Sequence, residues 1–234
     1  MSVAVLADIH GNIHALDAVV SDPRMPEEIV VLGDVVAGTF PVECFDRLQG
    51  LGDRMRVLCG NADRIVLERN MEEAVWVHDR LGAERVAAVE AWPPTFSIFV
   101  DGLGDVCCCH ATPRDDEEIV TKLTPEEDVI DALAGTGESI VVGGHTHMQL
   151  DRRVGPWRFV NVGSVGRPYE GRPGAYWTLL GPDVELVRTD YDVAAAAEAA
   201  RRSGQPRALD VVDTLLNPPT PDEAAAEFEA MRRP

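Results

Sequence analysis

Seven side chains that can bind a metal ion stand where apolar runs of the sequence end. "VAVLADIHGN" ends on a carboxylate and an imidazole, "IVVLGDVVAG" contains a second carboxylate, and "RVLCGNAD" contains an amide. "VCCCH" and "VVGGHTH" add three further imidazoles. In chain order these donors are Asp8, His10, Asp34, Asn61, His110, His145 and His147.

The mix of donors indicates which ions they would hold and what those ions would do. Carboxylate, imidazole and amide groups suit hard or borderline divalent cations, so the set predicts Mn, Fe, Zn or Ni and argues against a structural thiolate zinc site. Two such ions ~3.5–4 Å apart can clamp a phosphate and generate a hydroxide near neutral pH. The pair of ions needs a shared anionic ligand. Asp34 is the predicted bridge, because the neighbouring Gly33 lets the backbone approach closely.

The role of Asn61 has two interpretations from the residues alone. A Gly-Asn pair after the apolar run Met55 to Cys59 can simply end a strand, since both residues tolerate left-handed backbone angles. The same asparagine can instead supply a neutral oxygen to a metal ion. Both interpretations remain open at this level.

The elements that must position these donors alternate between strand and helix in the first part of the chain. We expect strands at 3–7, 29–32 and 55–59, helices at 12–20 and 41–49, and a largely helical segment at 64–92. This order implies parallel strands joined by helical crossovers. An open α/β sheet builds its site at the carboxyl ends of such strands, where the donors lie.

The second part of the chain is richer in strands. We expect strands at 96–100, 106–109, 140–142, 159–162, 175–180 and 184–189, with hairpin turns at "DGLGD" and "LLGPDVEL". Helices are predicted at 124–133, capped by Thr124, and at 192–204, capped by Asp192. From Asn217 a Pro-rich linker precedes a short amphipathic helix, which either docks on the body or binds a partner.

Taken in order, the motifs resemble those of a known family. "DIHGN", "LGD", "GNAD", "HATP" and "GHTH" follow the pattern of the calcineurin-like binuclear metallophosphoesterases. "NVGSVGRP" and "GAYWTLL" extend the resemblance to a bacterial branch of predicted phosphodiesterases that are similar to diadenosine tetraphosphatases. The resemblance assigns residues 1–204 to the metallophosphoesterase domain, with a helical insertion at 64–92, and leaves 205–234 as a C-terminal extension.

The resemblance implies a fold, a ligand set and an activity. The fold is α/β, with two mixed β-sheets packed as a sandwich and flanked by helices. The implied ligands of one metal are Asp8, His10 and His147, those of the other are Asn61, His110 and His145, and Asp34 bridges the two. The implied activity is hydrolysis of phosphate esters, as a phosphodiesterase whose nucleophile is a metal-bridging hydroxide.

One position departs from the commonest family pattern. Many members carry a histidine where this chain has Ala62, and that histidine contacts the substrate phosphate and can protonate the leaving group. The chain either works without this acid or is a non-catalytic protein-interaction scaffold on the same fold, and the complete ligand set favours the enzyme. Asp63 and His78 are the candidate catalytic side chains. The alternative role of Asp63 is to orient its loop or a ligand, and the alternative for His78 is an exposed or helix-capping position.

Two arginines are candidates for binding the phosphate of the substrate. Arg114 follows "HATP" and Arg167 lies in "GSVGRP", and either guanidinium can hold phosphate oxygens in a bidentate manner. Solvation or pairing with the many acidic side chains is the competing role for both. Nothing in the sequence identifies a base or a sugar, so the expected substrate is a small phosphate ester with an unspecified organic part.

Charge and composition limit the expected partners. The 40 acidic and 21 basic residues give a formal net charge of −19, which makes long nucleic acids poor candidate substrates. No apolar run reaches the ~20 residues of a membrane helix and no signal peptide pattern is present, so we expect no membrane span. The five cysteines lack C-x-x-C spacing, which fits a cytoplasmic location. The C-terminal tail is the expected site of any protein partner or self-association.

Overall fold

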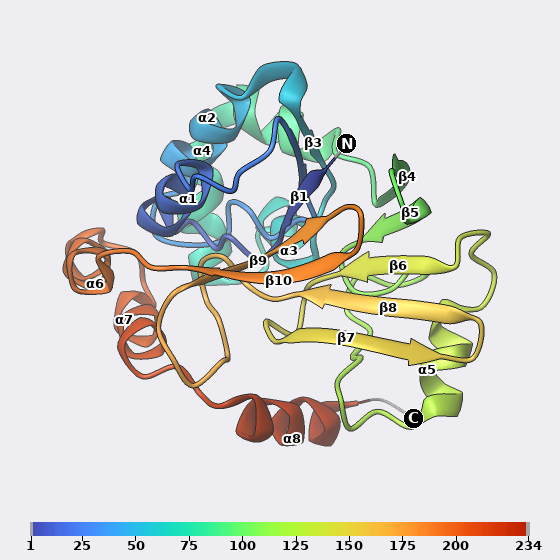
Figure 1. The fold of residues 1–234 in the computed structure, drawn as a ribbon. Helices are drawn as coiled ribbons and strands as arrows, with labels where there is room; N and C mark the ends of the chain where they lie inside the picture. The colour runs from blue at the N-terminus through green and yellow to red at the C-terminus, as the bar shows by residue number, and fades with distance from the viewer. Residues whose placement is uncertain (1, 233–234) are drawn as a thin grey trace.

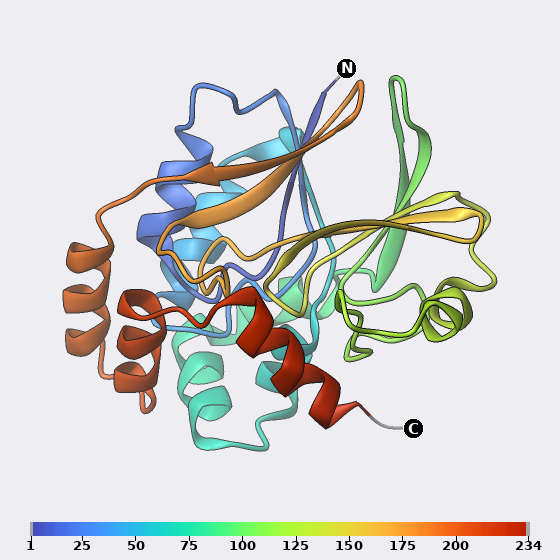
Figure 2. The same ribbon diagram turned by 60° about the horizontal axis from the view of Figure 1, so that its bottom comes forward.

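Two mixed sheets of five strands each pack on one another at the centre of the molecule (Figure 1). The structure is a computed structural model, and it describes residues 2–232. Helices flank both sheets (Figure 2). This arrangement confirms the α/β sandwich that the family resemblance implies.

The first sheet has the strand order β10-β9-β1-β2-β3. Its strands are β1 (Val3–Leu6), β2 (Glu28–Val31), β3 (Met55–Val57), β9 (Ala175–Leu180) and β10 (Val184–Thr189). The strands β1, β2 and β3 run parallel, whereas β9 is antiparallel to β1 and to β10. The segments that follow the three parallel strands therefore leave the sheet at the same edge.

The second sheet has the strand order β4-β5-β6-β8-β7. Its strands are β4 (Thr95–Val100), β5 (Gly104–Cys109), β6 (Ile140–Gly143), β7 (Gln149–Val154) and β8 (Trp157–Val162). Here β5, β6 and β8 are parallel, and the outer strands β4 and β7 are antiparallel to their neighbours. The carboxyl ends of β5 and β6 thus form a second set of neighbouring strand ends.

Alternate residues of each strand face different hydrophobic cores. On β1, Val5 packs in the core between the sheets, while Leu6 faces the helices that cover the first sheet. On β5, Cys108 lies between the sheets, and Cys107 and Cys109 face the outer core of the second sheet. All three thiols are free and buried, so they act as small hydrophobic residues.

Helices cover the outer face of each sheet. The first sheet is covered by α1 (Ile13–Val20), α2 (Pro41–Gln49) and α4 (Glu72–Glu90), and the second by α5 (Glu126–Leu133). A short 3₁₀ helix, η1 (Gly52–Arg54), precedes β3. The helix α3 (Asn61–Glu68) begins at a predicted metal ligand and, with α4, forms the helical segment expected at 64–92. A kink at Gly82, with φ 72°, divides α4.

Three helices complete the chain. The helices α6 (Val193–Arg202) and α7 (Ala208–Leu216) lie side by side at one edge of the molecule (Figures 1 and 2). The last helix, α8 (Pro221–Met231), buries Ala224 and Ala225 against Met148, with Phe228 and Tyr169 packed around them. The tail helix therefore docks on the body, which is one of its two predicted roles. Within residues 2–232 no helix has the length and apolar character needed to cross a membrane.

Besides η1, the structure adds one strand and one α-helix, and it corrects one cap. The strand β7 and the helix α7 do not follow from the sequence patterns above. The predicted cap of α5 by Thr124 is wrong, because this helix begins after Pro125 without a side-chain cap. The Thr124 hydroxyl instead accepts a 2.8 Å hydrogen bond from the Thr121 N–H and donates to Glu229 of α8. It thus ties the tail helix to the body.

Candidate metal centre

The seven predicted donors meet where the parallel strands of both sheets end. Each follows the carboxyl end of a strand, so the topology that orders the strands also gathers the side chains. They follow β1 (Asp8 and His10), β2 (Asp34), β3 (Asn61), β5 (His110) and β6 (His145 and His147).

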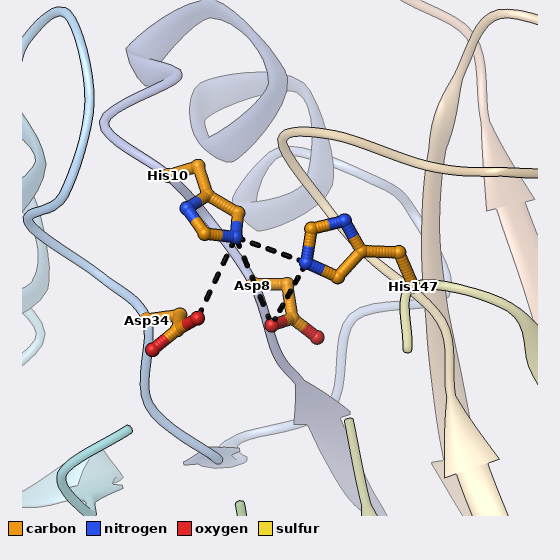
Figure 3. A group of neighbouring side chains, drawn as sticks. All are labelled: Asp8, His10, Asp34 and His147. Atoms are coloured by element: carbon orange, nitrogen blue, oxygen red, sulfur yellow. Dashed lines mark hydrogen bonds and ion pairs between the residues drawn. The ribbon is translucent and has the colours of Figure 1, made fainter. Parts of the chain in front are cut away.

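Four of the donors converge on one point. Asp8, His10, Asp34 and His147 each offer one ligand atom, and these four atoms all lie within 4.8 Å of one another (Figure 3). His147 Nε2 lies 3.3 Å from Asp8 Oδ1 and 3.0 Å from His10 Nε2. Asp34 Oδ2 lies 3.6 Å from His10 Nε2. Carboxylate and imidazole donors in such a group can hold one divalent cation.

The other three donors meet at the amide oxygen of Asn61. His110 Nε2 lies 2.8 Å from Asn61 Oδ1, and His145 Nδ1 lies 3.1 Å from the same oxygen. His110 Nε2 is also 3.4 Å from Asp34 Oδ2. Asp34 therefore lies between the two groups of donors, with the same carboxylate oxygen close to a ring of each group.

Backbone carbonyl groups orient three of the imidazole rings. A carbonyl oxygen only accepts hydrogen bonds, so each contacting Nδ1 must carry the proton and each Nε2 faces the cluster. These contacts join His10 to Ala37 O (3.2 Å), His110 to Leu32 O (2.6 Å) and His147 to Arg167 O (2.7 Å). Each ring is thus held with its Nε2 toward the predicted metal.

The backbone at the cluster is strained. Five of the seven donors have positive φ angles, a conformation that side chains other than glycine rarely adopt. They are Asp8 (54°), His10 (46°), Asp34 (53°), His145 (68°) and His147 (58°). Strain of this kind costs on the order of 1–3 kcal/mol per residue and persists only where the surroundings enforce it, which is typical of functional sites.

Two glycines allow the strand ends to approach closely. A Cβ atom on Gly33 would lie 2.3 Å from the backbone nitrogen of Gly60, and one on Gly60 would lie 2.2 Å from Asp34 Oδ1. Gly33 also has a φ of 84°. The predicted close approach beside Asp34 is therefore present, and it depends on both glycines.

The charges of the cluster shift one another's pKa values. Burial opposes ionisation of Asp8, yet His147 and His110 together lower its pKa. Burial also opposes ionisation of Asp34, and His110 lowers the pKa of this carboxyl. Burial also opposes protonation of His110, but Asp34 and Asp8 raise its pKa to about 10. Burial lowers the pKa of His10 to about 4, and the charge of His147 adds to this effect. The two carboxylates are therefore ionised inside the protein.

A cation fits the needs of these residues. Asp8 Oδ1 is buried and has no hydrogen-bond partner among residues 2–232, although it belongs to an ionised carboxylate. A buried charge left in this state is costly unless a cation or a proton donor satisfies it. The oxygen points at the same place as the imidazole nitrogens, as Figure 3 shows. The donor set and the unsatisfied oxygen thus agree with the metal dependence of the predicted site.

Asp63 lies behind the cluster and is fully buried. Its Oδ1 accepts hydrogen bonds from the N–H groups of Val35 (2.9 Å) and Val36 (3.0 Å), and its Oδ2 accepts one from Gly60 (3.2 Å). Burial and the charge of Asp34 raise the pKa of Asp63 to about 7. Because both oxygens bind backbone groups, this carboxyl joins the loop after β2 to the loop after β3, the orienting role predicted as its alternative.

The two candidate arginines have different surroundings. Arg114 is already paired, with its Nη2 2.6 Å from Glu118 Oε1 and its Nη1 2.9 Å from Asp131 Oδ2. Arg167 forms no ion pair within residues 2–232, and its Nε is buried without a hydrogen-bond partner. Arg167 also lines a cavity beside His10. The structure thus brings Arg167 to the site and leaves Arg114 with its acidic neighbours.

The other catalytic candidate, His78, lies away from this cavity. Its Nδ1 is 3.7 Å from Asp79 Oδ1 on the same helix, and its side chain is 23% exposed. The α4 residues that line the cavity are Glu73, Ala74 and Val77. The structure thus places His78 at the surface of its helix and not in contact with the cluster.

Two aromatic residues beside the cluster are absent from the predicted set. The ring of Tyr169 lies 4.7 Å from that of His147 between centroids, and Phe228 lies 6.1 Å from His145 and 6.2 Å from Tyr169. Tyr169 directly follows the "NVGSVGRP" motif, and this position is the signal that could have identified it. Phe228 lies in the tail helix, where no motif indicates which face docks.

Comparison with known proteins places this site in a family. Residues 1–180 match the model of the calcineurin-like phosphoesterase superfamily domain. An uncharacterized protein from Methanocaldococcus jannaschii is 27% identical over 240 residues, which cover 88% of this chain and 95% of that protein. The crystal structure of a metallophosphoesterase from Sphaerobacter thermophilus is 25% identical, with a TM-score of 0.77, and the match covers 93% of this chain and 99% of that chain.

A further structure shows the same fold at lower identity. The hypothetical protein from Pyrococcus horikoshii OT3 is 18% identical, with a TM-score of 0.79 over 94% of this chain and 99% of that chain. The sandwich and the donor cluster are those expected of the metal-dependent class of phosphoesterases. The chain belongs to the calcineurin-like phosphoesterase superfamily. Family membership supports phosphoester hydrolysis in general, and α6, α7 and α8 lie beyond the matched residues.

Proposed function

We propose that the chain is a phosphodiesterase that depends on two divalent metal ions. The observation that carries this proposal is the position of Asp34. Its Oδ2 lies 3.6 Å from His10 Nε2 and 3.4 Å from His110 Nε2, while its Oδ1 accepts a 2.8 Å hydrogen bond from the Ala62 N–H. One carboxylate oxygen thus faces both groups of donors, as a bridging ligand requires.

The family resemblance implies how the ligands would divide between the two ions. Asp8, His10 and His147 would hold one ion, Asn61, His110 and His145 the other, and Asp34 both. When bound, the ions would supply water activation and neutralise charge on the phosphoryl oxygens. The protein itself fixes the rings through backbone carbonyls and the loops through Asp63, so that the donors are positioned before substrate arrives.

Arginine pairing favours a diester over a monoester. Four arginines line the two cavities beside the cluster, and three of them form ion pairs, namely Arg114, Arg207 and Arg232. Only Arg167 remains for the phosphate among these four. A diester carries one negative charge whereas a monoester carries close to two at neutral pH, and the chain has a net charge of −19. One free guanidinium therefore suits the diester better.

The proposal is tested by metal content and hydrolysis measured together. Protein prepared with added Mn should contain two ions per chain by elemental analysis and should cleave an aryl phosphodiester. Removal of the ions with a chelator should abolish cleavage, and Mn should restore it. A metal content far below two ions together with no cleavage would reject the enzyme in favour of the interaction scaffold, for which the acidic surface and the tail would be the working parts.

A further inference from the structure

A cavity of about 170 Å³ adjoins the predicted metal centre. It begins beside His10, a member of the cluster in Figure 3, and lies between α3, α4 and α7. Most of its wall is apolar and consists of Ala62, Ile65, Val66, Ala74, Val77 and Val211. Because α7 lies beyond the residues that match the family model, part of this wall comes from outside the shared domain.

Two residues of the cavity wall each carry a buried polar atom that has no hydrogen-bond partner within residues 2–232. Arg167 Nε is a donor, and Gln205 Oε1 is an acceptor. Gln205 is only 8% exposed, so it belongs to the interior rather than to the surface. A buried polar group without a partner is costly, and a ligand that supplies the partner gains the corresponding free energy. Arg167 and Gln205 are therefore the residues of the wall to which a ligand would make its polar contacts.

The remaining cation of the cavity is already neutralised. Arg207 Nε lies 2.8 Å from Asp210 Oδ2, and its Nη1 lies 3.6 Å from Glu73 Oε1. The contact with Glu73 joins α7 to α4 at the cavity. Apart from His10 of the metal centre, Arg167 and Gln205 are then the polar side chains of the wall that lie outside these ion pairs.

The small side chain of Ala62 keeps the cavity open toward the cluster. Its backbone N–H is bonded to Asp34, and the residue lines the cavity. A larger side chain here would occupy the space between the cavity and the donors. The position that lacks the usual histidine thus gives room for part of a substrate.

We infer that this cavity binds the organic group of the phosphate ester, and that this group is apolar, about the size of one ring and bears an N–H or O–H donor. The inference rests on the proposed function, which places the phosphoryl group at the cluster. Arg167 binds a phosphoryl oxygen, and Gln205 accepts a hydrogen bond from the ring substituent. Pockets for drug-sized ligands measure about 300–1,000 Å³, so a cavity of about 170 Å³ holds only a fragment.

The second cavity beside the cluster suits such a group less well. It measures about 660 Å³ and reaches Asn61 and His145. Its lining includes five acidic residues, namely Asp115, Glu117, Glu118, Asp128 and Asp131. Transfer of an apolar ring from water is favourable into an apolar environment, which only the first cavity provides.

Phosphonates test the inference, because their C–P bond resists phosphoester hydrolysis. The affinities of methylphosphonate, benzylphosphonate and 4-aminobenzylphosphonate for the Mn-loaded protein are measured by calorimetry. Methylphosphonate has no ring, so it reports on the phosphoryl site, which consists of the metal centre and Arg167. We expect benzylphosphonate to bind about tenfold more tightly because its ring is buried. The amino group should add a further factor of about 2–10 through its hydrogen bond to Gln205.

Three variants assign these gains to the cavity. Val211→Trp should fill it and remove the tenfold gain from the ring, whereas Leu209→Trp, on the same helix but 72% exposed, should retain this gain. Gln205→Leu should remove only the gain from the amino group. Metal content and affinity for methylphosphonate should stay unchanged in all three.

The outcomes separate this inference from the proposed function. Equal affinities of methylphosphonate and benzylphosphonate in the unmodified protein would overturn the cavity assignment and leave the metal centre intact. If the ring still increases affinity in Val211→Trp, or the amino group still increases affinity in Gln205→Leu, the organic group binds elsewhere and the cavity assignment is overturned too. If the protein retains no metal and methylphosphonate does not bind, the proposed function fails, and the inference fails with it.

Discussion

His10 Nε2 and His147 Nε2 face each other at 3.0 Å, and both lie within 3.9 Å of Asp8 Oδ1. The Nδ1 atoms of both rings point at backbone carbonyls, so neither ring can turn its protonated nitrogen inward. Two such nitrogens are stable at this distance only with a proton or a cation between them. The unpartnered Asp8 Oδ1 beside them favours the cation, as the metal site requires.

The bridge assignment predicts different effects for two ligand variants. Asp34→Asn removes the shared charge, so it should weaken binding of both ions, whereas His147→Ala should chiefly weaken one. Loss of an outer partner of a metal ligand typically costs about 10–100-fold in affinity or activity, and loss of a ligand itself should cost at least that much. Elemental analysis and metal titration measure the two affinities. An Asp34→Asn protein that keeps two tightly bound ions and near-normal turnover would show that Asp34 is not the bridge.

Asp63 should matter for stability because its carboxyl joins two loops of the site. Asp63→Ala would leave three buried N–H groups, of Val35, Val36 and Gly60, without their acceptor. We expect a loss of at least about 3 kcal/mol in the free energy of unfolding, since each unsatisfied buried donor costs about 1–3 kcal/mol. Urea unfolding measures this loss, with Asp53→Ala, an exposed acid, as the control. A change below about 1 kcal/mol would show that water replaces the carboxyl.

The position of the site could be predicted because each donor follows a strand. Parallel strands that alternate with helices bring their carboxyl ends together, so linear motifs such as "DIHGN" and "GHTH" are enough to predict the cluster. The distances within it depend on features that the pattern does not show. The positive φ angles of Asp8 and His145 and the close approach of Gly33 to Gly60 are such features.

The missed elements lack local signals. The strand β7, "QLDRRV", is mostly polar because it lies at the edge of its sheet, so only its pairing with β8 identifies it. The helix α7 begins after Arg207, which provides no side-chain cap, and so it shows no start signal. Gln205, which lines the cavity just before α7, belongs to no motif, so the sequence does not mark it either. Arg114 illustrates a different limit, because its acidic partner Asp131 is distant in sequence.

The docked tail helix predicts a local response to a buried charge. Ala225→Glu would place a carboxylate in the contact with Met148, where Ala225 is fully buried, and should release α8. An isolated helix of this length is marginal in water, so amide hydrogen exchange at residues 221–231 should approach the rate of an unfolded peptide. Ala226→Glu, at an exposed neighbouring position, is the matched control and should keep the protection. Unchanged protection in Ala225→Glu would show that α8 is held by its ends. Those contacts join Glu229 to Thr121 and Asp222 to Lys122.

The last prediction concerns the general acid that Ala62 cannot supply. General acid catalysis contributes about 10²–10⁴-fold, and most when the departing oxygen is strongly basic. Without it, hydrolysis rates for phosphodiesters of graded leaving-group pKa should fall steeply as that pKa rises, so the enzyme should favour phenolate leaving groups over simple alkoxides. Ala62→His should make the dependence shallower, provided that the new ring protonates the departing oxygen.

Two further variants make this measurement decisive. Ala62→Gln fills similar space beside Asp34 without a titratable group, so it should lower rates without changing the slope, which separates proton transfer from loss of room in the cavity. His78→Ala should leave the slope unchanged, because His78 lies outside the residues that line the cavity. A flat dependence in the unmodified enzyme that steepens only in His78→Ala would make His78 the acid. A dependence that stays flat in every variant, with the chemical step rate-limiting, would require an acid from another part of the chain.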